Sequence, residues 1–258
     1  MTSTLAFICI AVSVLITSFI SGILGMAGGM ILMGVLLALL SLPAAMMLHG
    51  ITQMASNGWR AWLWRSNVKW RVFRGYAYGA LLAAGLFVLV QFVVSKATAY
   101  ILLGVTPFIS FVIPKHLTLN VDYRGHPFFC GVICTALQLL AGVSGPLLDV
   151  FFVRSSMTRY GVVATKAMSQ TLGHLIKILY FGGISAMTVA GNTMPAGLSV
   201  SLIVTCVVLA FTGTSFSTRV LNKMSDANFR SWTQWTVLTM GVIYLGSGVW
   251  LLAGFGKS

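Results

Sequence analysis

Residues 21–29 read Ser-Gly-Ile-Leu-Gly-Met-Ala-Gly-Gly and separate two apolar stretches near the start of the chain. The stretch that leads into them, residues 4–24, is long enough to cross a bilayer as a helix, whereas the apolar run over residues 30–41 is too short to do so comfortably. Glycine tolerates unusual backbone dihedral angles and lets the backbone approach its neighbours closely. These residues therefore predict a helical hairpin interrupted at a glycine break.

The rest of the chain has the composition of a protein that lies in a bilayer. Of its 258 residues, 58% are hydrophobic and only 7% are charged, whereas charged residues make up about 25% of a soluble domain. A membrane span needs roughly 20 apolar residues, so the chain has room for about eight to ten helical segments. We expect an all-α fold, a polytopic transmembrane helix bundle.

Hydropathy divides the remainder into further segments on either side of a second glycine break at residues 142–146. Before this break we expect helices at about 44–64, 75–94 and 97–114, and an apolar run that ends at Leu140. After it we expect a short stretch to Val153 and helices at about 160–181, 194–213 and 232–253.

Basic residues far outnumber acidic ones, with 16 Lys and Arg against three acids. A net charge of +13 on a soluble protein would suggest nucleic acid, but most of these residues lie in short loops between apolar segments. Such loops face the cytoplasm. Because this orientation in the membrane explains the basic charge, we expect membrane lipid as a partner and not nucleic acid. We expect loops 65–74, 115–126 and 214–231 in the cytoplasm, with the uncharged loop 182–193 and both termini outside.

The sequence repeats itself at an offset of 117 residues. Seven pairs of positions coincide without a gap: Gly25 with Gly142, Gly28 with Gly145, His49 with Lys166, Thr52 with Ser169, Gln53 with Gln170, Asn57 with His174, and Arg60 with Lys177. The pattern predicts two transmembrane repeats, residues 1–115 and 127–258, joined by a cytoplasmic linker at 116–126. The loop charges give the repeats opposite orientations, and each repeat has a glycine-interrupted hairpin followed by three spanning helices.

Each half carries one polar stripe on a long apolar helix. The first stripe holds His49, Gln53, Asn57 and Arg60, and the second holds Lys166, Gln170, His174 and Lys177. The spacing of three and four residues puts each set on one helix face. A polar face must meet the bundle interior, a cavity or a partner helix. Hydrogen bonding between helices is the alternative to a substrate path.

The stripes contain basic residues, histidines and amides but no acid, which favours an anion as the ligand. A helix that begins near Gly28 or Gly145 would aim free N–H groups at such an anion, although tight helix crossing explains glycines equally well. The predicted substrate-binding residues are Gln53, Asn57, His49, Gly28, Gly29, Lys166, Gln170, His174 and Gly145.

Asp149 is the acid expected at membrane depth. It either titrates as a proton-coupling group, a role for which His174 is a second candidate, or forms an ion pair with Lys166. The four cysteines lie in apolar runs without further metal ligands nearby, so we expect neither a metal nor a cofactor.

Inverted repeats with interrupted helices are typical of secondary transporters, which bind substrate near the membrane midplane and work by alternating access. A passive anion channel built from the same stripes is the alternative. An enzyme is not expected, because the sequence contains no HExxH motif, no Gly-x-Ser-x-Gly motif and no carboxylate pair.

The chain resembles the TauE/SafE family, also called the sulfite exporter or 4-toluene sulfonate uptake permease family. The resemblance lies in the layout of the Ser21–Gly29 stretch, the polar helix after Pro43, the basic loop Arg65–Trp70, and a diverged second copy from about residue 128. Met26, Met30 and Pro146 depart from the glycine-rich pattern of that family.

The resemblance implies transport of a small sulfur-containing anion across a bacterial inner membrane. Sulfite, a sulfonate or a related organosulfur compound would be the substrate, and the direction is left open. A zwitterionic substrate and a homodimeric assembly are both compatible with the sequence.

Overall fold

The computed structural model describes residues 3–24, 27–109, 119–188, 195, 197–221 and 226–254. Within these residues the chain is helical and contains no strand, which confirms the predicted polytopic helix bundle. Several predicted features lie partly or wholly outside the described residues: the Gly25–Met26 break, the end of the helix predicted at 97–114, and parts of the linker 116–126 and of the loops 182–193 and 214–231.

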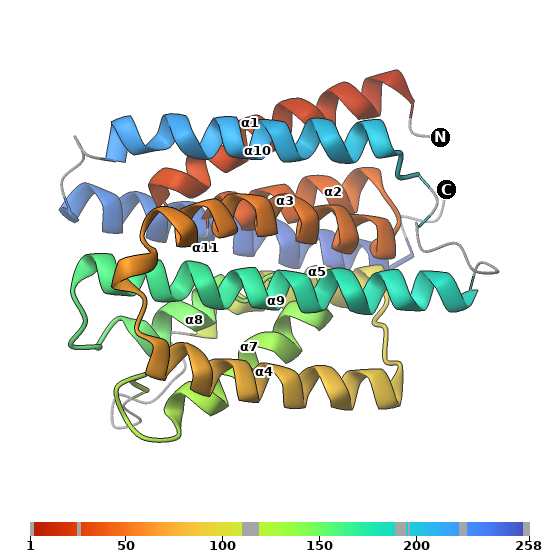
Figure 1. Ribbon diagram of the computed structural model, residues 1–258. Coiled ribbons are helices and arrows are strands. Elements are labelled where there is room, and N and C mark those ends of the chain that lie inside the picture. Colours follow the sequence, from red (N-terminus) through yellow and green to blue (C-terminus); the bar gives the residue numbers. More distant parts are fainter. Residues whose placement is uncertain are drawn as a thin grey trace.

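The long helices run along a common axis (Figure 1). Among the described residues, the first half forms α1 (Thr4–Leu24), α2 (Ala27–Leu39), α3 (Leu42–Leu63), α4 (Trp70–Val90) and α5 (Lys96–Val105), with 3-10 turns at Arg65–Asn67 and Thr106–Phe108. The second half forms α7 (His126–Ala141), α8 (Gly145–Phe152), α9 (Arg159–Thr188), α10 (Val200–Leu221) and α11 (Asp226–Leu252).

The helices that follow the glycine breaks are short. Helix α2 has 13 residues and α8 has eight, which at 1.5 Å per residue gives about 20 Å and about 12 Å. Neither length reaches across the roughly 30 Å hydrocarbon core of a bilayer. The second break forms because Gly142, at φ +82°, ends α7 in a left-handed conformation and Pro146 occupies the first turn of α8.

Several helices differ in length from the predicted spans. Helix α9 continues to Thr188, α10 continues to Leu221, and α11 begins at Asp226. Backbone hydrogen bonding continues beyond the apolar region that hydropathy marks. Hydropathy therefore placed the ends of α9 and α10 too early and the start of α11 too late. Helix α5 passes at Val105 into a 3-10 turn that contains Pro107, and residues 110–114 of the helix predicted here lie outside the described residues.

The helices pack in pairs that correspond between the halves. Helix α1 packs on α10 and α7 on α4, while α3 packs on α9 and α5 on α11. By order in each half, α1 corresponds to α7, α3 to α9, α4 to α10 and α5 to α11. When each helix is replaced by its counterpart, the α1–α10 contact becomes the α7–α4 contact, and the α3–α9 and α5–α11 contacts stay the same. This is the contact pattern that two halves related by a twofold axis produce. The contact between α4 and α7 is close: a Cβ atom on Gly131 would lie 2.0 Å from the carbonyl oxygen of Tyr76.

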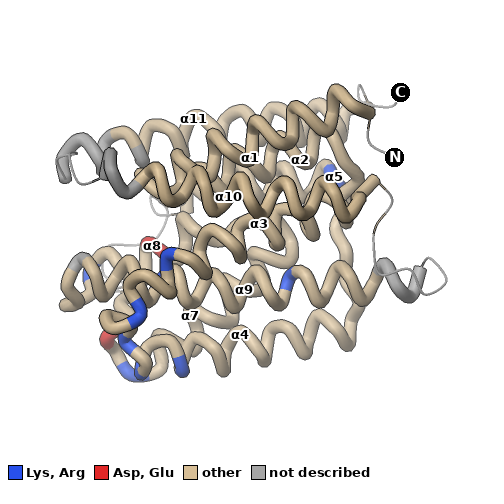
Figure 2. Tube along the Cα trace, turned by 45° about the horizontal axis from the view of Figure 1, so that its top comes forward, with Lys and Arg blue, Asp and Glu red and all other residues tan. Residues whose placement is uncertain are grey.

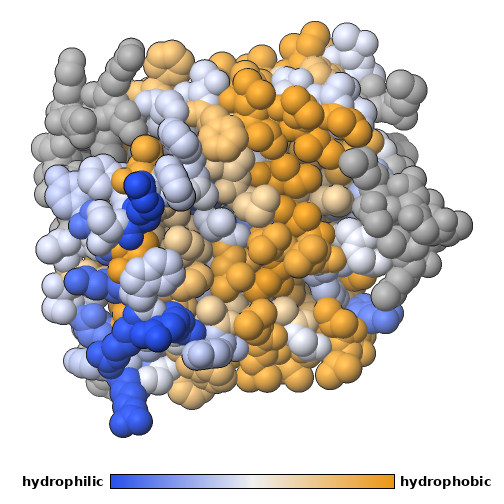
Figure 3. Space-filling view, viewed as in Figure 1, coloured by the Kyte–Doolittle hydropathy of each residue, from blue (hydrophilic) through white to orange (hydrophobic). Residues whose placement is uncertain are grey.

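Apolar side chains cover the outside of the bundle. In the part of the chain that the structure describes, four helices are long and apolar enough to cross a membrane, over residues Thr4–Ile23, Trp70–Val90, Val200–Ser217 and Gln234–Leu252. Figure 3 shows the apolar residues as a band across the molecule, with hydrophilic residues gathered at one end. Helices α3 and α9 carry the polar stripes and pack against each other. The chain is therefore a multi-pass membrane protein.

Positive charge marks one end of this bundle. Lys and Arg gather where α3 passes into α4 (Figure 2), and the chain begins and ends at the opposite end (Figure 1). Trp62 and Trp70, both more than half exposed, lie near the basic end, as expected of side chains at a membrane interface.

We predict that the basic end faces the cytoplasm. The test uses Ser66→Cys at that end and Ser95→Cys at the other, two exposed positions, in a Cys9→Ala background because Cys9 is the exposed native thiol among the described cysteines. A membrane-impermeant thiol reagent should label Ser95→Cys in intact cells and Ser66→Cys only after permeabilisation. The reverse labelling would invert the orientation.

Candidate functional site

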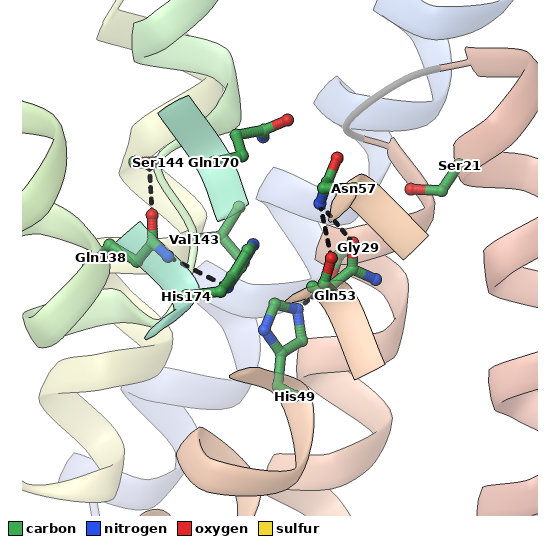
Figure 4. A pocket seen from close by; sticks show the side chains of 10 residues that line it. All are labelled: Ser21, Gly29, His49, Gln53, Asn57, Gln138, Val143, Ser144, Gln170 and His174. Carbon is green, nitrogen blue, oxygen red and sulfur yellow. Dashed lines mark hydrogen bonds between the residues drawn. The ribbon is translucent and has the colours of Figure 1, made fainter. Parts of the chain in front are cut away.

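A polar pocket lies between the two halves, near the middle of α3 and α9 (Figure 4). Five residues from each half line it: Ser21, Gly29, His49, Gln53 and Asn57 from the first, and Gln138, Val143, Ser144, Gln170 and His174 from the second. The stripes and the breaks of both halves thus meet in one place. Six of the nine predicted substrate-binding residues line this pocket, and Gly28, Gly145 and Lys166 do not.

The lining residues correspond through the 117-residue offset. Gln53 and Gln170 form one such pair, and Asn57 and His174 form another. A third pair, Ser21 and Gln138, also lines the pocket and was missed in the sequence. Both members of this pair lie one helical turn before the first glycine of their break, so the offset could have found them.

Gln53 presents a hydrogen-bond donor that no described residue bonds. Asn57 Nδ2 donates to the Gln53 carbonyl oxygen at 2.9 Å and lies 3.4 Å from Gln53 Oε1. The other end of the amide, Gln53 Nε2, is buried and has no hydrogen-bond partner among the described residues. Because an unpaired buried donor costs about 1–3 kcal/mol, its place in a pocket indicates a partner that binds there.

On the other side of the pocket, a short hydrogen-bond chain fixes His174. Ser144 Oγ donates to Gln138 Oε1 at 2.9 Å, and Gln138 Nε2 lies 3.0 Å from His174 Nδ1. Since the amide nitrogen donates, Nδ1 accepts, and the neutral imidazole carries its proton on Nε2. The ring centroids of His174 and His49 are 5.5 Å apart, so the two histidines face each other across the boundary between the halves.

His49 is held by both halves. Its Nε2 lies 2.9 Å from the carbonyl oxygen of Gly29, which can only accept, so this nitrogen donates. Its Nδ1 lies 2.8 Å from Lys177 Nζ, which also donates to the carbonyl oxygen of Gly142 at 2.9 Å. One continuous hydrogen-bond chain therefore runs from the start of α2, through α3 and α9, to the second glycine break.

Arg60 makes a related set of contacts in the first half. It donates to the carbonyl oxygen of Ser21 at 3.1 Å and to Asn57 Oδ1 at 3.3 Å. Both of these residues line the pocket. Arg60 thereby ties the last turn of α1 to the polar stripe of α3.

The remaining predicted site residues lie away from the pocket lining. Lys166 forms an ion pair with Asp149, which joins α9 to α8. Gly28 packs α2 on α1, since a Cβ atom there would lie 2.1 Å from the carbonyl oxygen of Thr17. Gly145 is the buried first residue of α8. These placements correspond to the structural roles that the sequence left open as alternatives.

The pocket is narrow. It has room for about one water molecule. Its lining offers hydrogen-bond donors and no carboxylate. No group of three or more potential metal ligands occurs in the part of the chain that the structure describes.

One comparison with known proteins gives a match. The family model described as "Sulfite exporter TauE/SafE" matches residues 9–244, most of the chain. Neither the curated proteins nor the solved structures contain a significant match.

Proposed function

Because the chain belongs to the sulfite exporter TauE/SafE family, we propose that it is a secondary transporter of a small sulfur-containing anion. Sulfite, a sulfonate or a related organosulfur compound is the proposed substrate, and the bacterial inner membrane is the proposed location. The proteins of this family are membrane transporters of sulfur anions rather than enzymes. This agrees with the function that the family resemblance in the sequence implies.

The pocket between the halves is the proposed substrate site. The observation that carries this proposal is the unpaired Nε2 of Gln53, which is buried inside the pocket. Oxygen atoms of a sulfite or sulfonate group accept hydrogen bonds, and bonds to a charged acceptor are the stronger ones. His174, which lines the pocket and carries its proton on Nε2, supplies a second donor from the opposite half. A tetrahedral oxyanion held between the two donors would contact both halves at once.

Alternating access is the proposed mechanism. The pocket has room for about one water molecule, so it must widen to admit a sulfonate, and we propose that the halves move apart on one side of it. Residues 1–115 and 127–258 are the proposed moving repeats, as the matched helix contacts support. The narrow pocket gives no support to the alternative of a passive channel, which needs a continuous path.

Proton coupling is proposed to act through His174. This histidine lines the pocket, whereas Asp149 is bound in its ion pair with Lys166. Protonation of His174 would turn Nδ1 from an acceptor into a donor and break its bond with Gln138 Nε2. Proton binding would thus change the hydrogen bonds of the second break.

We predict that Gln53→Ala and Gln170→Ala each weaken binding of the transported sulfur anion by about tenfold or more, because each removes a side-chain amide available to the ligand. Thermal shift of purified protein measures this, with sulfite, thiosulfate, taurine, sulfoacetate and aromatic sulfonates as ligands and chloride, acetate and an amine as controls. Gln234→Ala, which changes an exposed glutamine of α11, is the matched control. Wild-type affinity in both pocket variants would mean that the stripes only hold helices together.

We predict that His174→Gln abolishes accumulation of the anion against its gradient while downhill exchange continues. Proteoliposomes with an imposed pH gradient measure both properties, and Asp149→Asn serves as the comparison. Gradient-driven accumulation that survives in His174→Gln but not in Asp149→Asn would move the coupling role to Asp149. Ionic currents too large for a carrier would identify a channel instead.

A further inference from the structure

The residues that line the pocket carry no formal charge in the state that their hydrogen bonds define. None of them is acidic, lysine or arginine, and the donors around His49 and His174 require neutral imidazoles. A pocket with neutral walls can bind a sulfonate through hydrogen bonds, but those bonds alone distinguish poorly between a charged sulfonate and a neutral sulfone. Selectivity for an anion must therefore come from charges outside the lining.

Two cations lie directly behind this lining, one in each half. Lys177 is fully buried, and its ammonium group contacts His49 Nδ1 and the Gly142 carbonyl oxygen. Arg60, at the corresponding position of the first half, contacts the Ser21 carbonyl oxygen and Asn57 Oδ1. Each cation is thus one hydrogen bond away from a residue that lines the pocket.

Neither cation is paired with an acid whose side chain the structure describes. Of the aspartates whose side chains the structure describes, Asp149 pairs with Lys166, and Asp122 accepts from the backbone N–H of Ser156. The contacts of Lys177 and Arg60 are instead carbonyl and amide oxygens and a ring nitrogen. Two of these oxygens belong to the C-terminal ends of α1 and α7, which carry partial negative charge. That partial charge holds each cation in place and leaves most of its positive charge uncompensated.

We propose that Lys177 and Arg60 are the residues that make the pocket selective for anions, acting on the substrate through space without touching it. This inference rests on the proposed transport site. A hydrogen bond, an imidazole ring and one further contact together span roughly 8 Å. At that distance, and at an effective dielectric constant of about 20, a unit charge changes the affinity for an opposite charge on the order of tens of fold. Capping of the broken helices α1 and α7 is the purely structural role against which this one is tested.

The test compares an anion with a neutral molecule of similar shape. Methanesulfonate and dimethyl sulfone are titrated into purified wild-type protein and into Lys177→Gln and Arg60→Gln, and the ratio of their affinities is the readout. Glutamine keeps a hydrogen-bond donor for the helix ends but removes the charge, so a structural cap would leave the ratio unchanged. Lys96→Gln is the matched control, because Lys96 donates to the Leu40 carbonyl oxygen away from the pocket.

We expect the preference for the anion to fall about tenfold or more in each glutamine variant, to fall further in the double variant, and to return in Arg60→Lys. An unchanged ratio in both glutamine variants would overturn the inference while leaving the transport site intact. If the wild type prefers acetate or nitrate to neutral analogues in the same Lys177-dependent way but binds no sulfur compound, the inference holds and the proposed substrate is wrong. A wild-type protein that binds no anion overturns both.

Discussion

The polar faces of two helices must find hydrogen-bond partners inside the bilayer, because no bulk water is present there to supply them. Helices α3 and α9 place His49, Gln53, Asn57 and His174 at the centre of the bundle, each at most 4% exposed. A buried polar group without a partner is costly, so these side chains can lie only where other polar groups meet them. Packing α3 against α9 supplies some of those groups, and the glycine breaks supply the rest.

The breaks matter because they bring backbone groups to the same depth as the stripes. An unbroken helix hydrogen-bonds its own carbonyl groups, whereas the end of α7 leaves the carbonyl oxygen of Gly142 free to accept from Lys177. At the other break, the carbonyl oxygen of Gly29 lies in the first turn of α2 and accepts from His49, which uses the second lone pair that a helical carbonyl group still offers. Short helices, buried cations and polar stripes are therefore parts of one arrangement, and the pocket occupies the space that these groups leave between them.

The sequence predicted this arrangement to the extent that it is periodic. Stripe residues at helical spacing fixed which faces of α3 and α9 turn inward, and the 117-residue offset related Gln53 to Gln170 and Asn57 to His174, which do meet in one pocket. The helical membrane bundle and the family were also predicted correctly.

Other parts of the site depend on three-dimensional contacts that no spacing reveals. Lys166 lies on the same stripe as Gln170, yet its pairing with Asp149 on α8 keeps it out of the lining. Lys177 approaches His49 only because α9 crosses α3 at that point. Gln138 contributes its amide to the pocket because α7 ends beside α9. The predicted helix ends were wrong for a different reason. Hydropathy marks the part of a helix that lies in the membrane, whereas the helix continues for as long as its backbone hydrogen bonds do.

The most direct test of the central claim is to locate the substrate in a crystal of this protein. Selenite is the heavier analogue of sulfite, and its anomalous scattering marks the position of the anion. We expect one strong peak between the halves, within hydrogen-bonding distance of Gln53 Nε2 and His174 Nε2, and its loss in Gln53→Ala. A peak elsewhere, such as the groove beside Lys96 and Tyr100, with none between α3 and α9, would contradict it.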